Sequence, residues 1–104
     1  FFQILSSSSP LYVQVSVRIK GRVQGVYYRK WTVENASRLG LDGWVRNRRD
    51  GSVEAVFSGN TWHVDAMVES CKIGPEAAVV TSVTVEPLAS LDHPSKGFER
   101  RPTE

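Results

Sequence analysis

Cysteine and histidine are the scarcest reactive residues in this sequence. Among 104 residues there is one cysteine, Cys71, and there are two histidines, His63 and His93. A single cysteine cannot form an internal disulfide, and ligands this few and this far apart do not make a zinc site. The sequence therefore excludes a disulfide scaffold, predicts neither metal nor cofactor, and favours a reducing compartment, which we take to be the cytoplasm.

Long hydrophobic runs are missing as well. No apolar stretch approaches the ~18 residues that span a membrane, so we expect no membrane association. Apolar residues make up 40% of the chain and charged residues 23%, which is ordinary for a globular protein and argues against wholesale disorder. The length suits one domain with a modest core, and we expect a monomer.

Acidic residues are few in the first half of the chain. Residues 18–51 carry nine basic side chains against three acidic ones, a net charge of +6, whereas residues 52–95 carry one lysine against six acids, a net charge of −5. Such a field favours an anionic ligand near the first half, although a solvated basic face would look the same. The overall charge of +2 is smaller than proteins that coat nucleic acid usually carry, so we expect no nucleic-acid partner.

The first ten residues, FFQILSSSSP, show no periodicity and contain no initiator methionine. The serine run closed by Pro10 is typical of a flexible leader, so we place the folded domain at residues 11–104. Such a leader is also what remains of a targeting segment, in which case an organelle would replace the cytoplasm as the location.

Alternating apolar residues predict the strands. Apolar side chains at every second position from Leu11 to Lys20 indicate a half-buried strand that stops at Gly21. The dipeptide Asp50-Gly51 is a hairpin-turn signal. Further strands are predicted at residues 43–47, 52–58, 79–87 and about 98–101. In the strand at 79–87 the alternating residues Val79, Thr81, Val83 and Val85 are predicted to share one face.

Apolar residues three and four positions apart predict two helices. The first, at about residues 26–39, ends before Gly40, a residue that suits a helix C-terminus. The second follows a cap at Asn60 or Thr61 and ends at Gly74. Helices inserted between antiparallel strand pairs predict an α+β sandwich, in which both helices cover one face of the sheet and a short last strand is added.

The loop between the first strand and the first helix is the clearest candidate site. The segment GRVQGVYYR, from Gly21 to Arg29, places main-chain N–H groups at a helix N-terminus, where the helix dipole attracts phosphate. Arg29 adds a planar fork of donors that suits phosphate oxygens. An ordinary turn followed by a surface arginine would show the same pattern. The predicted phosphate-binding loop consists of Gly21, Arg22, Val23, Gln24, Gly25, Val26, Tyr27 and Tyr28.

Three sequence blocks together carry a family resemblance. The block GRVQGVYYR is followed by GWVRN, whose last residue Asn47 lies eighteen positions after Arg29, and then by DGSVEAVFSG. In this order the blocks resemble the acylphosphatase family, from about Val13 to the end of the chain. The resemblance implies a ferredoxin-like βαββαβ fold. It also implies hydrolysis of an acyl phosphate, a small-molecule substrate, to a carboxylate and inorganic phosphate without metal or cofactor.

The resemblance also assigns roles to particular residues. It implies that Arg29 binds the phosphate, that Asn47 positions the attacking water, and that the amides of residues 22–27 cradle the phosphate. Two positions depart from the family pattern. Tyr28 stands where phenylalanine is usual, so a buried hydroxyl needs a partner, and Arg100 occupies a position that is otherwise apolar.

The last residues depart from the pattern too. Pro102 takes the place of a terminal tyrosine. In some members the C-terminal carboxylate helps to orient the arginine, whereas here Glu104 lies further on.

Two alternatives share the predicted order of elements. An RNA-recognition domain would need exposed aromatic side chains on its middle strands, where this sequence offers only Phe57. A non-catalytic anion-binding module would keep the loop without the chemistry. We expect Tyr27 either to line the site or to pack beside it. The remaining candidates are predicted to be solvated (His63, His93), packed in the second helix (Cys71), or part of the core or its rim (Trp31, Trp44, Trp62).

Overall fold

A computed structural model describes residues 11–89 and 96–104. The leader predicted at residues 1–10, and His93, lie outside the described residues. None of the helices in the described part is long and apolar enough to cross a membrane. The elements follow the predicted order: β1 (Tyr12–Arg22), α2 (Tyr28–Arg38), β2 (Asp42–Asn47), β3 (Val53–Asn60), α3 (Thr61–Cys71), β4 (Val79–Pro87) and β5 (Phe98–Arg101).

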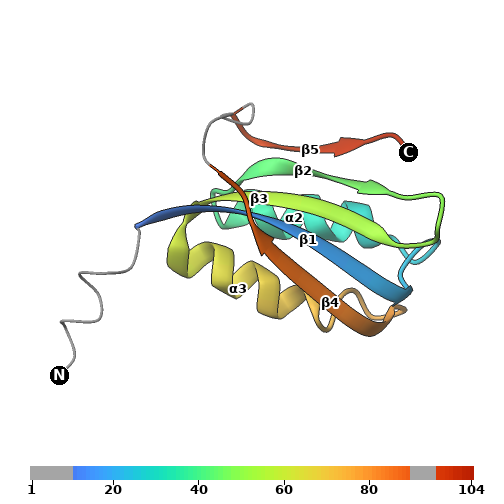
Figure 1. The fold of residues 1–104 in the computed structure, drawn as a ribbon. Helices are drawn as coiled ribbons and strands as arrows, with labels where there is room; N and C mark the ends of the chain where they lie inside the picture. Colours follow the sequence, from blue (N-terminus) through green and yellow to red (C-terminus); the bar gives the residue numbers. More distant parts are fainter. Residues whose placement is uncertain (1–10, 90–95) are drawn as a thin grey trace, which may run out of the picture.

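The strands form one open sheet in the order β4-β1-β3-β2-β5, and both helices lie on the same face of it (Figure 1). Strands β1 to β4 pair antiparallel, as predicted. The short strand β5 adds to the free edge of β2 in parallel, which makes the sheet mixed. This pairing brings the C-terminal residues alongside the end of β2.

The core lies between the sheet and the two helices. Phe57 and Ile19 from the sheet and Tyr28 and Met67 from the helices are at most 1% exposed. Removing a large apolar side chain from water stabilises the fold by about 1.5–3 kcal/mol. The predicted cap of the second helix is Asn60, whose side chain accepts a hydrogen bond from the Trp62 amide at 2.8 Å.

The end of β1 corrects the predicted strand boundary. The strand continues through Gly21 and Arg22, which pair with Val80 and Val79 of β4. Gly21 has a φ of 126°, and a Cβ atom there would lie 2.1 Å from the Val79 carbonyl oxygen. Gly21 is therefore required by the close approach of β4, and it belongs to the sheet rather than to the loop.

A shift in the pairing between β1 and β4 corrects the predicted alternation of β4. The pairing skips Thr81 between Ser82 and Val80, so the strand bulges there and its alternation changes phase. Val80 packs against the core, whereas Val79, predicted on the apolar face, is 57% exposed. Leu11 was also predicted to begin an apolar face, but it precedes β1 and is 83% exposed.

Candidate active site

A cavity of about 470 Å³ opens at the N-terminus of α2. It brings Arg29 and Asn47, which lie eighteen residues apart in sequence, to one place. Four of the eight predicted loop residues line it, whereas Gly21, Arg22, Gln24 and Val26 do not. The lining consists of Val23, Gly25, Tyr27, Tyr28, Arg29, Lys30, Asn47 and Arg100.

The loop is shaped by two buried valines and two left-handed residues. Val23 is fully buried and Val26 is 8% exposed, so both anchor the loop in the core. Gly25 has a φ of 75° and Tyr27 a φ of 65°, and Tyr27 is the one non-glycine residue of the described chain with a positive φ. A left-handed conformation costs about 1–2 kcal/mol for a residue with a side chain. Such strain is concentrated at functional sites.

The N-terminus of α2 carries free hydrogen-bond donors. The residue that begins the helix, Tyr27, provides no side-chain cap. Within residues 11–89 and 96–104, the amide N–H groups of residues 25–30 have no hydrogen-bond acceptor. Unpaired amides and the positive end of the helix dipole together make a binding site for an anion. The geometry therefore supplies the donors that the predicted loop requires, although fewer of its residues face the cavity.

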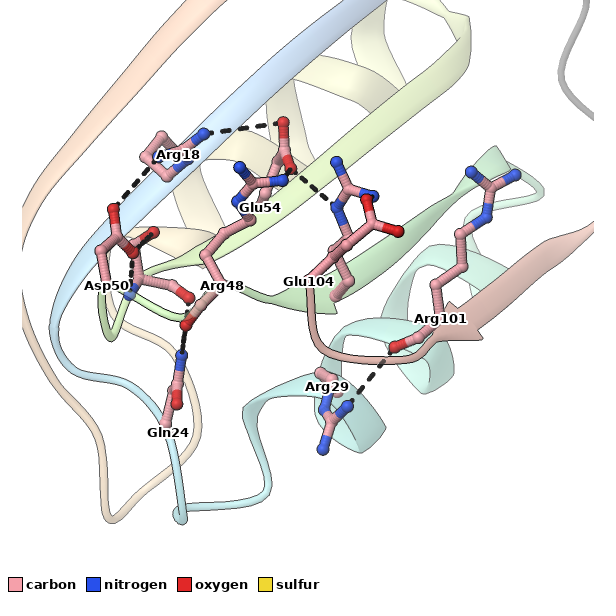
Figure 2. A network of polar contacts seen from close by, with 10 residues as sticks. Arg18, Gln24, Arg29, Arg48, Asp50, Glu54, Arg101 and Glu104 are labelled. Atoms are coloured by element: carbon pink, nitrogen blue, oxygen red, sulfur yellow. Dashed lines mark hydrogen bonds and ion pairs between the residues drawn. The ribbon is translucent and has the colours of Figure 1, made fainter.

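Arg29 reaches the cavity from the first turn of α2. Its Nη1 donates to the main-chain oxygen of Arg101 at 3.4 Å, so the end of β5 supports the guanidinium (Figure 2). Burial, followed by the positive charge of Arg100, lowers the pKa of Arg29. No acidic side chain of the described residues pairs with Arg29, which leaves its positive charge for a ligand.

Asn47 joins the cavity lining from a different element, at the last position of β2. Its main-chain oxygen accepts a hydrogen bond from the Glu104 amide at 3.0 Å, and its main chain pairs with Val53. In the described part of the chain its side-chain amide has no partner. The backbone is thus fixed while the amide remains available to the cavity.

Gln24 links the loop to the turn between β2 and β3. Its Nε2 donates to the main-chain oxygens of Arg48 at 2.7 Å and Ser52 at 2.9 Å (Figure 2). The sequence analysis placed Gln24 among the phosphate-cradling residues, and its role in joining the loop to the Asn47 strand was missed. No local sequence signal reveals this contact, because the partners lie 24 and 28 residues away.

Three arginines of the basic segment are engaged on the other face of the sheet. Glu54 accepts from Arg46 at 2.9 Å and from Arg48 at 3.3 Å, and Arg18 lies 3.7 Å from the same carboxylate (Figure 2). The guanidinium groups of Arg46 and Arg101 each lie over the ring of Trp44, at 4.8 and 4.7 Å from its centroid. These charges are neutralised or stacked, and none of these residues lines the cavity.

The structure also shows how deeply the other residues discussed in the sequence analysis are buried. The Tyr28 hydroxyl has the partner that its burial requires, the main-chain oxygen of Cys71 at 2.5 Å. Cys71 is buried, as predicted, and burial raises the pKa of its thiol to about 12. His63 is exposed on α3, and Tyr27 lines the cavity while being 79% exposed. Trp62 was predicted in the core or at its rim, but it is 81% exposed.

Phe57, the aromatic residue that the sequence offered for an RNA-recognition surface, does not lie on the open face of the sheet. Phe57 is fully buried in the core and stacks on Phe98 with ring centroids 5.4 Å apart. Within the described ranges, no three His, Cys, Asp or Glu side chains are close enough to hold a metal ion. The cavity at α2 is therefore the place where the chain concentrates groups suited to an anion.

Comparison with known proteins decides the family. A sequence model of the acylphosphatase family matches residues 15–100. The chain belongs to the acylphosphatase family. A relative from Rhodospirillum rubrum named acylphosphatase is 54% identical over 87 residues, which cover 84% of this chain and 93% of the relative. The chain is accordingly a hydrolase of this family.

Solved structures of the family confirm the predicted fold. The acylphosphatase from Bacillus subtilis superposes with a TM-score of 0.81 at 34% identity, covering 86% of this chain and 98% of the other. The acylphosphatase from Coxiella burnetii superposes with a TM-score of 0.80 at 33% identity, covering 86% and 93%. The ferredoxin-like α+β arrangement expected from the sequence is thus the observed one.

Proposed function

We propose that this chain hydrolyses the carboxyl–phosphate bond of small acyl phosphates in the cavity at the N-terminus of α2. One observation carries the proposal: Arg29, Asn47 and residues of the loop and first helical turn whose amides are unpaired line a single cavity. A phosphoryl transition state spreads negative charge over its oxygens, so positioning and electrostatics supply most of the catalysis.

The amides and Arg29 hold the phosphoryl group. Several N–H donors and a bidentate guanidinium suit its oxygens better than a point charge would. Water attacks phosphorus, the bond between phosphorus and the acyl oxygen breaks, and a carboxylate leaves with the electron pair. The carboxylic acid conjugate to the leaving group has a pKa well below neutral, so the carboxylate departs with little help from a general acid.

Asn47 orients the attacking water. Its amide oxygen can accept one hydrogen bond but cannot take the proton at neutral pH. The proton that water loses passes to a phosphoryl oxygen, and the product is inorganic phosphate. Neither a metal ion nor a cofactor takes part in this proposed sequence.

Turnover of benzoyl phosphate tests the proposal. The native chain should release inorganic phosphate with or without a chelator, and Arg29→Gln should lower kcat/KM by about a hundredfold or more. Asn47→Ala should lower kcat strongly while inorganic phosphate, measured as a competitive inhibitor, binds with similar affinity. The control is Arg38→Gln, which removes one charge at the far end of α2.

Two results would contradict these roles. Near-normal turnover by Arg29→Gln would remove Arg29 from the phosphate site. Loss of phosphate binding in Asn47→Ala, as complete as in Arg29→Gln, would make Asn47 a phosphate ligand rather than a water-positioning residue. A native chain that binds phosphate but releases none from benzoyl phosphate would be the non-catalytic anion-binding module.

We further propose a monomer, located in the cytoplasm, as the working form. The cavity is built by residues of one chain, so hydrolysis needs no second copy. Light scattering during size-exclusion chromatography measures the mass of the working form, which we expect to be that of one chain. If a dimer forms at higher concentration, a greater activity per chain in the dimer would contradict the proposal. Fractionation of the source cells checks the second.

A further inference from the structure

Arg100 lies on the same face of the sheet as Arg29. In the parallel pairing of β5 with β2, Arg100 is opposite Val45, which is fully buried beneath the helices. Successive side chains of a strand point to opposite faces. Arg100 therefore faces the side of α2, whereas its neighbour Arg101 stacks on Trp44 on the open face. This explains how an arginine occupies a position where the family pattern has an apolar residue: at the sheet edge the position borders the cavity and is exposed.

The charged side chains that line the cavity are all basic. Arg29, Lys30 and Arg100 line it, and no aspartate or glutamate does. Lys30 lies 3.9 Å from Glu34, but among the described residues no acid pairs with Arg29 or Arg100. On the open face, by contrast, three arginines share Glu54. The positive charge of Arg100 also contributes to lowering the pKa of Arg29, because the two guanidinium groups repel each other.

A second anionic group would relieve this repulsion. The amides of residues 25–30 and Arg29 already match one phosphoryl group, and Asn47 is assigned to water. Arg100 enters from β5 and is held by a different element from the loop amides. A cavity of about 470 Å³ lies in the range that holds a small-molecule ligand and so has room beyond a phosphoryl group.

We propose that Arg100 binds a second negatively charged group on the acyl part of the substrate, so that the preferred substrates are acyl phosphates with an anionic acyl chain. This rests on the proposed hydrolysis and adds the substrate class. The second group is a carboxylate or a phosphate elsewhere on the acyl chain, away from the bond that is hydrolysed. A guanidinium binds either group in a bidentate manner.

Paired substrates measure the preference. We compare kcat/KM for benzoyl phosphate and 4-carboxybenzoyl phosphate at about 0.15 M salt, where long-range steering is screened. The native chain should favour the carboxylated substrate, and Arg100→Gln should reduce that preference by about tenfold. Arg100→Lys should keep part of it. Arg38→Gln, which carries the same net charge as Arg100→Gln, should keep all of it.

Other outcomes overturn the inference. Equal losses on both substrates in Arg100→Gln would show that Arg100 serves the phosphoryl group. An unchanged ratio would show that it contacts neither part of the substrate. An Arg38→Gln variant that lost the preference equally would reduce the effect to net charge.

A binding measurement separates this inference from the hydrolysis itself. Phosphonate analogues, in which a methylene replaces the scissile oxygen, are titrated calorimetrically with and without the 4-carboxylate. If the native chain releases no phosphate but shows a carboxylate preference that Arg100→Gln abolishes, the hydrolysis proposal fails and the assignment of Arg100 stands. If hydrolysis proceeds but neither measurement shows a preference for the carboxylate, the assignment of Arg100 fails and the hydrolysis proposal stands.

Discussion

Tyr28 connects the candidate site to the far end of the helix layer. Tyr28 is part of the cavity lining, and its ring packs edge-on against Trp31 with centroids 5.3 Å apart. Its hydroxyl donates to the main-chain oxygen of Cys71, the last residue of α3. Burial raises the pKa of Tyr28, so the hydroxyl keeps its proton and remains a donor. The substitution of tyrosine for the family's phenylalanine therefore adds one hydrogen bond between the two helices.

Tyr28→Phe should lower the free energy of unfolding by about 1–2 kcal/mol, because the buried Cys71 oxygen loses its donor. Urea denaturation measures this as a lower midpoint at an unchanged m-value. Tyr27→Phe removes the same atom from a ring that is 79% exposed, and it should leave the midpoint where it is. A Tyr28→Phe variant as stable as the native chain would show that this hydrogen bond contributes nothing to stability.

At the scale of elements, the loop before α2 and the turn after β2 behave as one unit. Gln24 spans them by donating to the carbonyls of Arg48 and Ser52. In the proposed mechanism the loop carries the phosphate donors and β2 carries Asn47, so we expect Gln24 to set the distance between the phosphate and the water. This residue is a positioning residue, because it lies outside the cavity lining and acts through the two main-chain segments.

Gln24→Ala should lower kcat with benzoyl phosphate by about tenfold, because small misplacements of reacting groups reduce rates strongly. Inorganic phosphate should bind only slightly more weakly, since the amides and Arg29 remain. The urea midpoint and the circular dichroism spectrum distinguish positioning from general destabilisation: a tenfold lower kcat in a variant that is fully folded under the assay conditions supports positioning, whereas a loss of kcat that matches the unfolded fraction contradicts it. Gln14→Ala makes the same chemical change on β1, away from the cavity, and should behave as the native chain.

Across the whole molecule, the basic first half of the chain divides into two populations. Arg18, Arg46 and Arg48 share Glu54 on the open face and hold the sheet together. Arg49 is exposed, two residues beyond Asn47, and no acid of the described residues pairs with it. The sequence analysis treated this segment as one electrostatic field, whereas the structure separates structural arginines from those free to attract substrate.

Arg49→Gln should therefore lower kcat/KM about two- to threefold at low ionic strength, through weaker capture, and have no effect in about 0.5 M salt. Arg46→Gln should instead lower the melting temperature, because it removes the 2.9 Å pair with Glu54 and one cation over Trp44. Activity and thermal denaturation of both variants across a salt series test this. Salt-independent loss of activity in Arg49→Gln would contradict the capture role.

Element order, helix capping and family membership were determined by the sequence alone. The reason is that periodicity, the Asn60 cap and Gly40 at the end of α2 act over a few residues. The motif blocks also predicted Arg29 and Asn47 as site residues, and the structure brings both to one cavity. Their catalytic roles remain predictions.

The tertiary structure alone decided which loop residues face the cavity, where β1 ends, and what Arg100 borders. Gly21 pairs with β4, which approaches too closely for a Cβ atom at this position. The register of that pairing shifts between Lys20 and Gly21, which leaves Thr81 in a bulge. Gln24 turns from the cavity to carbonyls 24 and 28 residues away. Arg100 reaches Arg29 because β5 pairs in parallel with β2, so that residues separated by most of the chain share one face. Such outcomes depend on how distant segments pack against one another, and no local pattern in the sequence encodes that.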